Sequence, residues 1–79
     1  MPIREFLKYF SGETKVTIKS MRMNGLGDKT YDSLFNAKKI KDITRVETYF
    51  ESILSRTIAE GQVTIIDSVI IIVLDDTGL

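Results

Sequence analysis

The feature that most constrains the fold is a run of six consecutive apolar residues near the C-terminus, Val69 to Leu74. Successive side chains of a strand point to opposite faces of a sheet, so this run places apolar side chains on both faces. In a two-layer domain, helices cover one face of an antiparallel sheet and water contacts the other. We expect Val69, Ile71 and Val73 to pack beneath the helices, which leaves the alternate side chains to be covered by something else.

The alternate side chains of this run are Ile70, Ile72 and Leu74. Burying each of them would contribute roughly 1.5–3 kcal/mol, whereas together in water they would form an aggregation-prone patch. The cover would be either a helix on that face or a second copy of the chain. We interpret Ile70, Ile72 and Leu74 as self-association residues, and the sequence therefore predicts a homo-oligomer.

The chain has 79 residues and contains neither cysteine nor histidine. A single domain of this size keeps only roughly 3–5 kcal/mol of net stability from its core. Disulfides are excluded, and a zinc site would have only carboxylates as ligands. We therefore expect one α+β domain over residues 1–79 that holds no metal and no cofactor and gains stability by association.

Helical periodicity predicts two helices, over about residues 2–11 and 45–60. In the first, apolar residues recur at positions i, i+3, i+4 and i+7, and Gly12 is expected to end the helix in a left-handed conformation. Thr44 and Glu47 form the capping-box pattern that opens the second helix. The apolar faces of the two helices are expected to pack on the sheet through Phe6, Leu7, Phe10, Phe50, Ile53 and Leu54.

Strand patterns lie between and after these helices. Residues 14–21 alternate apolar and polar side chains, and Asn24-Gly25 favours a hairpin turn. The segment 30–43 is ambiguous, because a short strand that runs into a loop or a single turn competes with a helical face. Residues 62–66 and 69–74 indicate two strands joined by a tight turn, with one long bent strand as the alternative. These elements predict a small two-layer domain with an antiparallel sheet of three to four strands.

The zero net charge conceals an asymmetry between two parts of the chain. Residues 1–45 carry ten Lys or Arg and five Asp or Glu, whereas residues 46–79 carry one basic and six acidic residues. We expect the two parts to lie side by side and neutralise each other. The alternative is a nucleic-acid-binding surface in the basic 15–45 region, although the pI of about 6.2 is below the range typical of such domains. The residues of this nucleic-acid or partner face are Lys15, Lys19, Arg22, Lys38, Lys39 and Lys41.

Little in the sequence points to catalysis. The absence of histidine and cysteine removes the commonest general base and the strongest thiol nucleophile. The segment Gly25–Thr30 lacks the P-loop spacing, because Asp28 stands where that motif requires glycine. Asp75 and Asp76 are adjacent, so on a strand they would point to opposite faces, and with Asp67 they are expected to keep the strand ends soluble. We predict no catalytic residue, with a Ser–Lys dyad left open.

Three segments, 3–7, 14–18 and 69–73, carry a resemblance to a group of proteins. Their order of helix, basic strand and terminal apolar strand resembles that of short uncharacterised α+β proteins encoded by phages and mobile elements of Gram-positive bacteria. No chemistry is assigned to that group, but it includes host-defence inhibitors, which are commonly small non-catalytic binders. The resemblance implies an accessory protein whose partner is a host protein.

The N-terminal residues lack the apolar run of a signal peptide, and the run Val69–Leu74 is too short to span a bilayer. We therefore expect a cytoplasmic protein that contacts no membrane. The sequence as a whole predicts a small non-enzymatic protein-interaction module that associates with itself. Nucleic-acid binding through the basic 15–45 region is the alternative.

Overall fold

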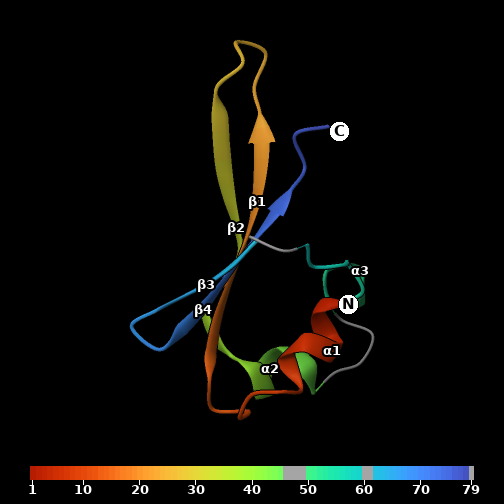
Figure 1. The fold of residues 1–79 in the computed structure, drawn as a ribbon, viewed down its shortest axis with the longest axis vertical. Coiled ribbons are helices and arrows are strands. Elements are labelled where there is room, and N and C mark those ends of the chain that lie inside the picture. Colours follow the sequence, from red (N-terminus) through yellow and green to blue (C-terminus); the bar gives the residue numbers. More distant parts are fainter. Residues whose placement is uncertain (46–49, 60–61, 79) are drawn as a thin grey trace.

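A computed structural model describes residues 1–45, 50–59 and 62–78 of the chain. In these ranges the chain forms a four-stranded sheet, with the strand order β2-β1-β4-β3, and three short helices (Figure 1). The strands are β1 (Lys15–Met23), β2 (Lys29–Lys39), β3 (Val63–Ile66) and β4 (Val69–Asp75). The helices are α1 (Ile3–Leu7), α2 (Ile40–Thr44) and α3 (Glu51–Leu54). The predicted α+β class is confirmed.

The two hairpins of the sheet are joined by a parallel pair of strands. β1 pairs with β2, and β3 with β4, in antiparallel orientation, but β1 and β4 run parallel in the centre of the sheet. The sheet is therefore mixed, which corrects the prediction of an antiparallel sheet. Turn residues specify each hairpin locally, whereas a parallel pair depends on a long crossover connection and leaves no local signal in the sequence.

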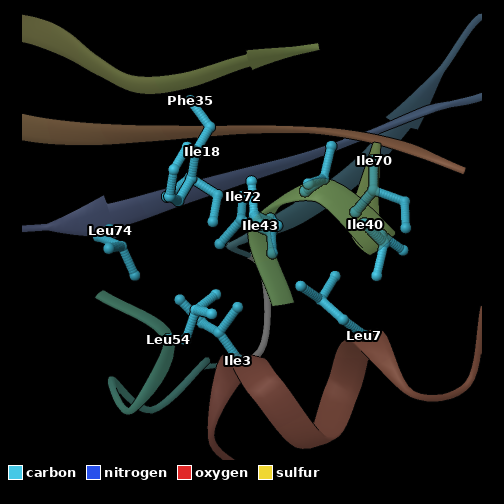
Figure 2. Packing of buried hydrophobic residues seen from close by; sticks show 11 residues of the cluster. Ile3, Leu7, Ile18, Phe35, Ile40, Ile43, Leu54, Ile70, Ile72 and Leu74 are labelled. Carbon is cyan, nitrogen blue, oxygen red and sulfur yellow. The ribbon is translucent and has the colours of Figure 1, made fainter. Parts of the chain in front are cut away.

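The helices cover one face of the sheet, and the core lies between them and the central strands (Figure 2). Ile70, Ile72 and Leu74 of β4 point into this core, with exposed fractions of 1%, 0% and 1%. The parallel register places Val16 beside Ile70 and Ile18 beside Ile72. The prediction that Ile70, Ile72 and Leu74 lie outside the helix-covered face is therefore wrong.

The expected and observed structures of β4 differ in which alternate residues face the helices. Side chains alternate between the faces of a sheet with a period of two residues, so a shift of one residue moves the whole apolar set to the other face. Pairing with β1 and the tight turn before β4 set this phase. Val69, Ile71 and Val73 consequently lie half-buried on the face opposite the helices, which we call the open face.

The helices are shorter than the periodicity predicts. α1 ends at Leu7, and of the helix predicted over 45–60 only Glu51–Leu54 is helical within the described residues. After α3 the chain turns to bond with the N-terminal segment, where the Ile58 N–H donates to the Met1 carbonyl oxygen at 2.9 Å. That backbone pairing replaces further helical hydrogen bonds. Among the described residues, no helix is long and apolar enough to cross a membrane.

The residues expected to form the helix side of the core do contact it. Leu7 and Leu54 are buried, and the partly buried residues packed against the core include Phe6, Phe10, Phe50 and Ile53. The expected helix-terminal signals act differently. Thr44 is the last residue of α2 and donates its hydroxyl to the Ile40 carbonyl oxygen at 2.8 Å, instead of opening a helix.

Glu47, the second residue of the predicted capping box, lies outside the described residues. Gly12 has no left-handed conformation. It lies against Lys41 instead, whose Cβ would be 3.2 Å from a Cβ added at residue 12, and its carbonyl oxygen accepts a hydrogen bond from the Lys41 N–H. Glycine at position 12 therefore permits a close approach between the chain before β1 and α2.

The ambiguous segment 30–43 resolves into most of β2 followed by α2. Two irregularities interrupt the pairing of β2 with β1, on either side of Ile18. At the first, Ala37 has a φ angle of 51° and its N–H donates to the Thr17 hydroxyl oxygen at 3.0 Å. A bulge of this kind bends the strand and disrupts the regular edge ladder.

The β1–β2 hairpin extends well beyond the helices (Figure 1). Its tip confirms the turn predicted at Asn24-Gly25, although the loop runs as far as Asp28. The Asn24 side-chain oxygen accepts hydrogen bonds from the N–H groups of Leu26 and Asp28, and Gly27 has a φ angle of 85°. We call this projection, residues 21–33, the arm.

Candidate functional site

The β3–β4 hairpin is organised by its two-residue turn. Asp67 and Ser68 have φ angles of 51° and 64°, the pair of left-handed conformations of a type I′ turn, whose twist matches that of the flanking strands. The turn confirms the hairpin predicted over residues 62–74 and excludes the single bent strand. It pairs Ile66 directly with Val69.

The hydrogen-bond pattern of this hairpin aims part of the β3 backbone outward. In an antiparallel pair, opposite residues alternate between exchanging two hydrogen bonds and exchanging none. The Val73 N–H donates to the Gln62 carbonyl oxygen at 2.9 Å, so residues 62, 64 and 66 form the hydrogen-bonded positions. The N–H and C=O groups of Val63 and Ile65 therefore point away from β4, toward the edge of the sheet.

The side chains of β3 leave this edge apolar and accessible. Ile65 and Ile66 point to opposite faces of the sheet and have exposed fractions of 59% and 53%. The four residues of β3 include no charged residue and no proline, and their pairing with β4 has no bulge. Natural sheets commonly protect an edge strand with such features. We call residues 63–66, with their outward backbone groups, the β3 edge.

The open face carries two neighbouring columns of different character. On β4, the half-buried side chains of Val69, Ile71 and Val73 form an apolar column. On β1, Lys15 lies beside Val69 and Lys19 beside Val73. Two of the predicted basic face residues therefore flank the apolar side chains that the run Val69–Leu74 leaves outside the helix-covered core. The prediction of an uncovered apolar set holds for the odd-numbered residues of the run rather than the even-numbered ones.

The other basic residues of the predicted face are dispersed. Lys39 and Lys41 both contact Glu13, with Nζ–Oε distances of 3.0 and 2.5 Å. Hydrogen bonds from Lys41 and then Lys39 lower the pKa of Glu13 to about 2, and Glu13 raises the pKa of Lys41. These two lysines are therefore held by a carboxylate on the loop before β1.

Arg22 and Lys38 lie apart from this cluster. Arg22 is on the arm, where its Nε is 3.7 Å from an Asp32 carboxylate oxygen and both side chains are mostly exposed. Lys38 is exposed on β2, opposite Val16. Of the ion pairs between described residues, only Arg4 with Glu51 joins the basic part of the chain to the acidic part. The charges of Lys29 and Arg22 also act on Asp75 and Asp76, so the two parts interact electrostatically beyond this ion pair.

A buried carboxylate cluster lies just beyond β4. Asp76 is 6% exposed and accepts hydrogen bonds from the Arg56 guanidinium at 2.6 and 3.1 Å and from the Ser20 hydroxyl. Its backbone N–H donates to the Met21 carbonyl oxygen at 2.8 Å. Asp76 thus ties β1, the end of β4 and the segment after α3 together, and the expectation of a solvated carboxylate at this strand end is wrong.

The chemistry of this cluster favours a structural role. The hydrogen bonds from Arg56 and then Ser20 lower the pKa of Asp76 to about 2. An efficient general base needs a pKa close to the working pH, so Asp76 is poorly suited to remove the proton of Ser20 at neutral pH. This cluster leaves no signature in the sequence, because Asp76, Arg56 and Ser20 are far apart in the chain and form no motif.

A groove of about 410 Å³ lies between α1 and α2. Its lining includes Arg4, Leu7, Lys8, Phe10, Ile40 and Lys41. Arg4 contacts the Glu51 carboxylate at 2.9 Å and Lys41 contacts Glu13, so these two cations are already held by acidic partners. Within the described ranges, no group of three His, Cys, Asp or Glu side chains is placed to bind a metal ion.

Comparisons with known proteins identify no relative of this chain. No protein-family model matches the chain, and neither the search of curated proteins nor that of solved structures finds a match. The β3 edge combines exposed apolar side chains and outward backbone groups with a regular, uncharged strand, and we take it as the candidate functional site. Its only signal in the sequence is an uncharged β-branched segment that ends at the turn residues Asp67 and Ser68.

Proposed function

We propose that this chain is a small non-enzymatic protein-interaction module that associates with copies of itself through the β3 edge. The observation that carries the proposal is the coincidence of exposed Ile65 and Ile66 with backbone groups that point away from the sheet. An uncharged strand edge of this kind is a template for pairing with another strand. Covering it removes apolar area from water and provides partners for the outward N–H and C=O groups.

Other exposed apolar residues support the choice of this edge by contrast. Leu26 and Tyr31 of the arm are exposed, but the arm also carries Arg22, Asp28 and Asp32. Charged side chains interleaved with apolar ones keep a hairpin soluble and discourage unspecific strand pairing. The β3 edge has no such charges among its four residues.

The resemblance to phage and mobile-element proteins extends the proposal to the biological setting. Such a module would act in the cytoplasm as an accessory protein, for example as an inhibitor of a host defence, with a host protein as its further partner. The open face, with Val69, Ile71 and Val73 beside Lys15 and Lys19, would then remain available after self-association.

The test is sedimentation velocity over a concentration series, from low to high micromolar, on the parent chain and two variants. Ile66→Lys places a charge on the β3 edge, and Leu26→Lys places the same charge on an exposed leucine at the tip of the arm. We expect the parent and Leu26→Lys to associate and Ile66→Lys to stay monomeric. A parent chain that is monomeric throughout would overturn the proposal, and so would equal association of all three proteins.

A further inference from the structure

The β3 edge has a symmetry that points to one particular partner. Residues 62–66 are paired with β4 as an extended segment, and Asp67 then enters the left-handed conformation of the turn. The extended segment is therefore centred on Thr64. An antiparallel partner strand of the same sequence, related by a two-fold axis, pairs with it over its full length only when Thr64 lies opposite Thr64 of the other copy.

This register matches the direction of the backbone groups. Val63 and Ile65 carry the outward N–H and C=O groups, and in this register Val63 of each copy lies opposite Ile65 of the other. Each of these two pairs exchanges two hydrogen bonds, which gives four across the axis. A register centred on Ile65 instead would place Val63 opposite Asp67, whose left-handed backbone cannot continue a strand.

The side chains also match. A two-fold axis perpendicular to the sheet keeps the helices of both copies on the same face, so Ile65 packs against Val63 of the other copy on that face. Ile66 lies opposite Gln62 on the open face. Figure 1 shows the turn end of this hairpin on the side of the molecule away from the helices.

The other edge of the sheet argues against a growing chain of molecules. Head-to-tail pairing of β3 with β2 of another copy would not close and would build a filament. β2 is irregular, because its ladder shifts on either side of Ile18 and Ala37 has a left-handed φ angle of 51°. It also presents Asp32 and Lys38. A bulged and charged edge of this kind resists pairing, so association is confined to β3 with β3.

We propose that two copies of this chain pair β3 with β3 in antiparallel orientation, with Thr64 opposite Thr64, to form a closed dimer with one continuous eight-stranded sheet. This inference rests on the proposed function and specifies its contact. The partner is a second copy because the edge is uncharged and self-complementary about Thr64. The strand order across the dimer is β2-β1-β4-β3 followed by β3-β4-β1-β2 of the second copy.

Single-cysteine variants test the register, because the chain has no cysteine of its own. In the proposed dimer the two residues at position 64 form a pair without mutual hydrogen bonds, with a Cα–Cα distance of about 4.5 Å. That distance is within the range that a disulfide bridges. Thr64→Cys should therefore form a covalent dimer under mild oxidation. Two variants serve as matched controls. In Ile65→Cys the two cysteines are offset by two residues along the paired strands, because Ile65 lies opposite Val63 of the other copy. In Ser33→Cys the cysteine lies on the opposite edge of the sheet.

We expect Thr64→Cys to cross-link at least about tenfold faster than either control, because paired thiols have a high effective concentration. Faster cross-linking of Ile65→Cys would overturn the register. If the parent associates in sedimentation but Thr64→Cys cross-links no faster than Ser33→Cys, the β3–β3 contact is wrong while self-association stands. If the parent is monomeric, both the contact and the proposed function fail.

Discussion

The two edges of the sheet differ in almost every property that controls strand pairing. β2 is long, its ladder with β1 is interrupted by bulges, and it carries Lys38 and Asp32 along its length. β3 has four residues, regular pairing with β4, no charge, and two exposed isoleucines. Proteins commonly blunt an edge with charges and bulges where pairing is harmful. By charge and regularity, the β2 edge is protected against strand pairing and the β3 edge is not.

The bulge on β2 has a structural reason as well. The Thr17 hydroxyl accepts the Ala37 N–H, and the strand bends at this point before it enters α2 at Ile40. The bend brings Lys39 and Lys41 to Glu13. The β2 edge is thus shaped by its connection to the helical layer, whereas the β3 edge follows from the tight turn and the regular pairing with β4.

The largest expected effect tests whether the central strand between the two edges belongs to the monomer core. Ile72 is fully buried in β4, so Ile72→Ala should lower the free energy of unfolding by about 2–5 kcal/mol, through lost burial and a residual cavity. Urea denaturation followed by circular dichroism measures this change. Leu26→Ala, at an exposed fraction of 89%, is the control and should leave the midpoint nearly unchanged. Equal stability of both variants would mean that Ile72 is not in the core. The placement of β4 as a central strand, and of β3 as the edge strand beside it, would then be wrong.

A smaller effect is expected at the carboxylate that anchors the end of β4, between the two edges. Asp76→Asn should cost about 2 kcal/mol at neutral pH, less than the about 3–5 kcal/mol of a fully buried pair, because the Arg56 side chain is 36% exposed. The folded pKa of Asp76, about 2, lies below its ordinary value of 3.8. The stability it contributes is therefore complete above about pH 4 and is lost as the pH falls through 2.

Urea midpoints measured from pH 7 to pH 2 check this dependence. The parent should lose stability below pH 4 more steeply than Asp76→Asn, and the two curves should converge near pH 2. Glu13→Gln is the matched control: the pKa of Glu13 is also lowered to about 2, but its side chain is exposed and its ion pairs are screened by solvent, so this variant should follow the parent curve closely. Parallel curves for parent and Asp76→Asn would show that the buried cluster does not stabilise the fold.

The smallest expected effect is the binding of nucleic acid to the open face. Such binding would mean that the functional surface is this face and neither edge of the sheet. Lys15 and Lys19 lie on one face of β1, but Lys39 and Lys41 are held by Glu13, so we expect no measurable binding of single- or double-stranded DNA or RNA at low salt. Fluorescence anisotropy measures it. Salt-dependent binding, with a slope that falls by about one unit in a Lys15→Ala or Lys19→Ala variant, would make the open face the functional surface instead.

Local patterns in the sequence predict much of the fold. Alternation in residues 14–21 locates β1, and the turn residues Asn24-Gly25 and Asp67-Ser68 locate both hairpins. The helical spacing after Pro2 locates α1, although not its end. These features depend on side-chain periodicity and on the backbone preferences of a few turn residues, which act within one or two turns of chain.

The candidate site was harder to predict from the sequence than the hairpins and α1. The run Val69–Leu74 correctly predicts apolar side chains on both faces of a strand, but it does not indicate which set the helices cover. That choice required the parallel register of β1 with β4, which buries Ile70 and Ile72 and leaves Val69, Ile71 and Val73 outside. The outward direction of the β3 backbone likewise follows from pairing rather than from composition.

The sequence by itself therefore determined β1, the start of α1, both hairpin turns and the presence of an apolar surface beyond the helix-covered core. Only the tertiary structure decided the parallel contact of β1 with β4, the phase of β4, and the burial of Asp76 between Arg56 and Ser20. The physical reason is the range of the interactions. Periodicity and turn preferences are set by neighbouring residues, whereas a strand's phase depends on contacts with segments distant in the chain, and a one-residue shift reverses its two faces.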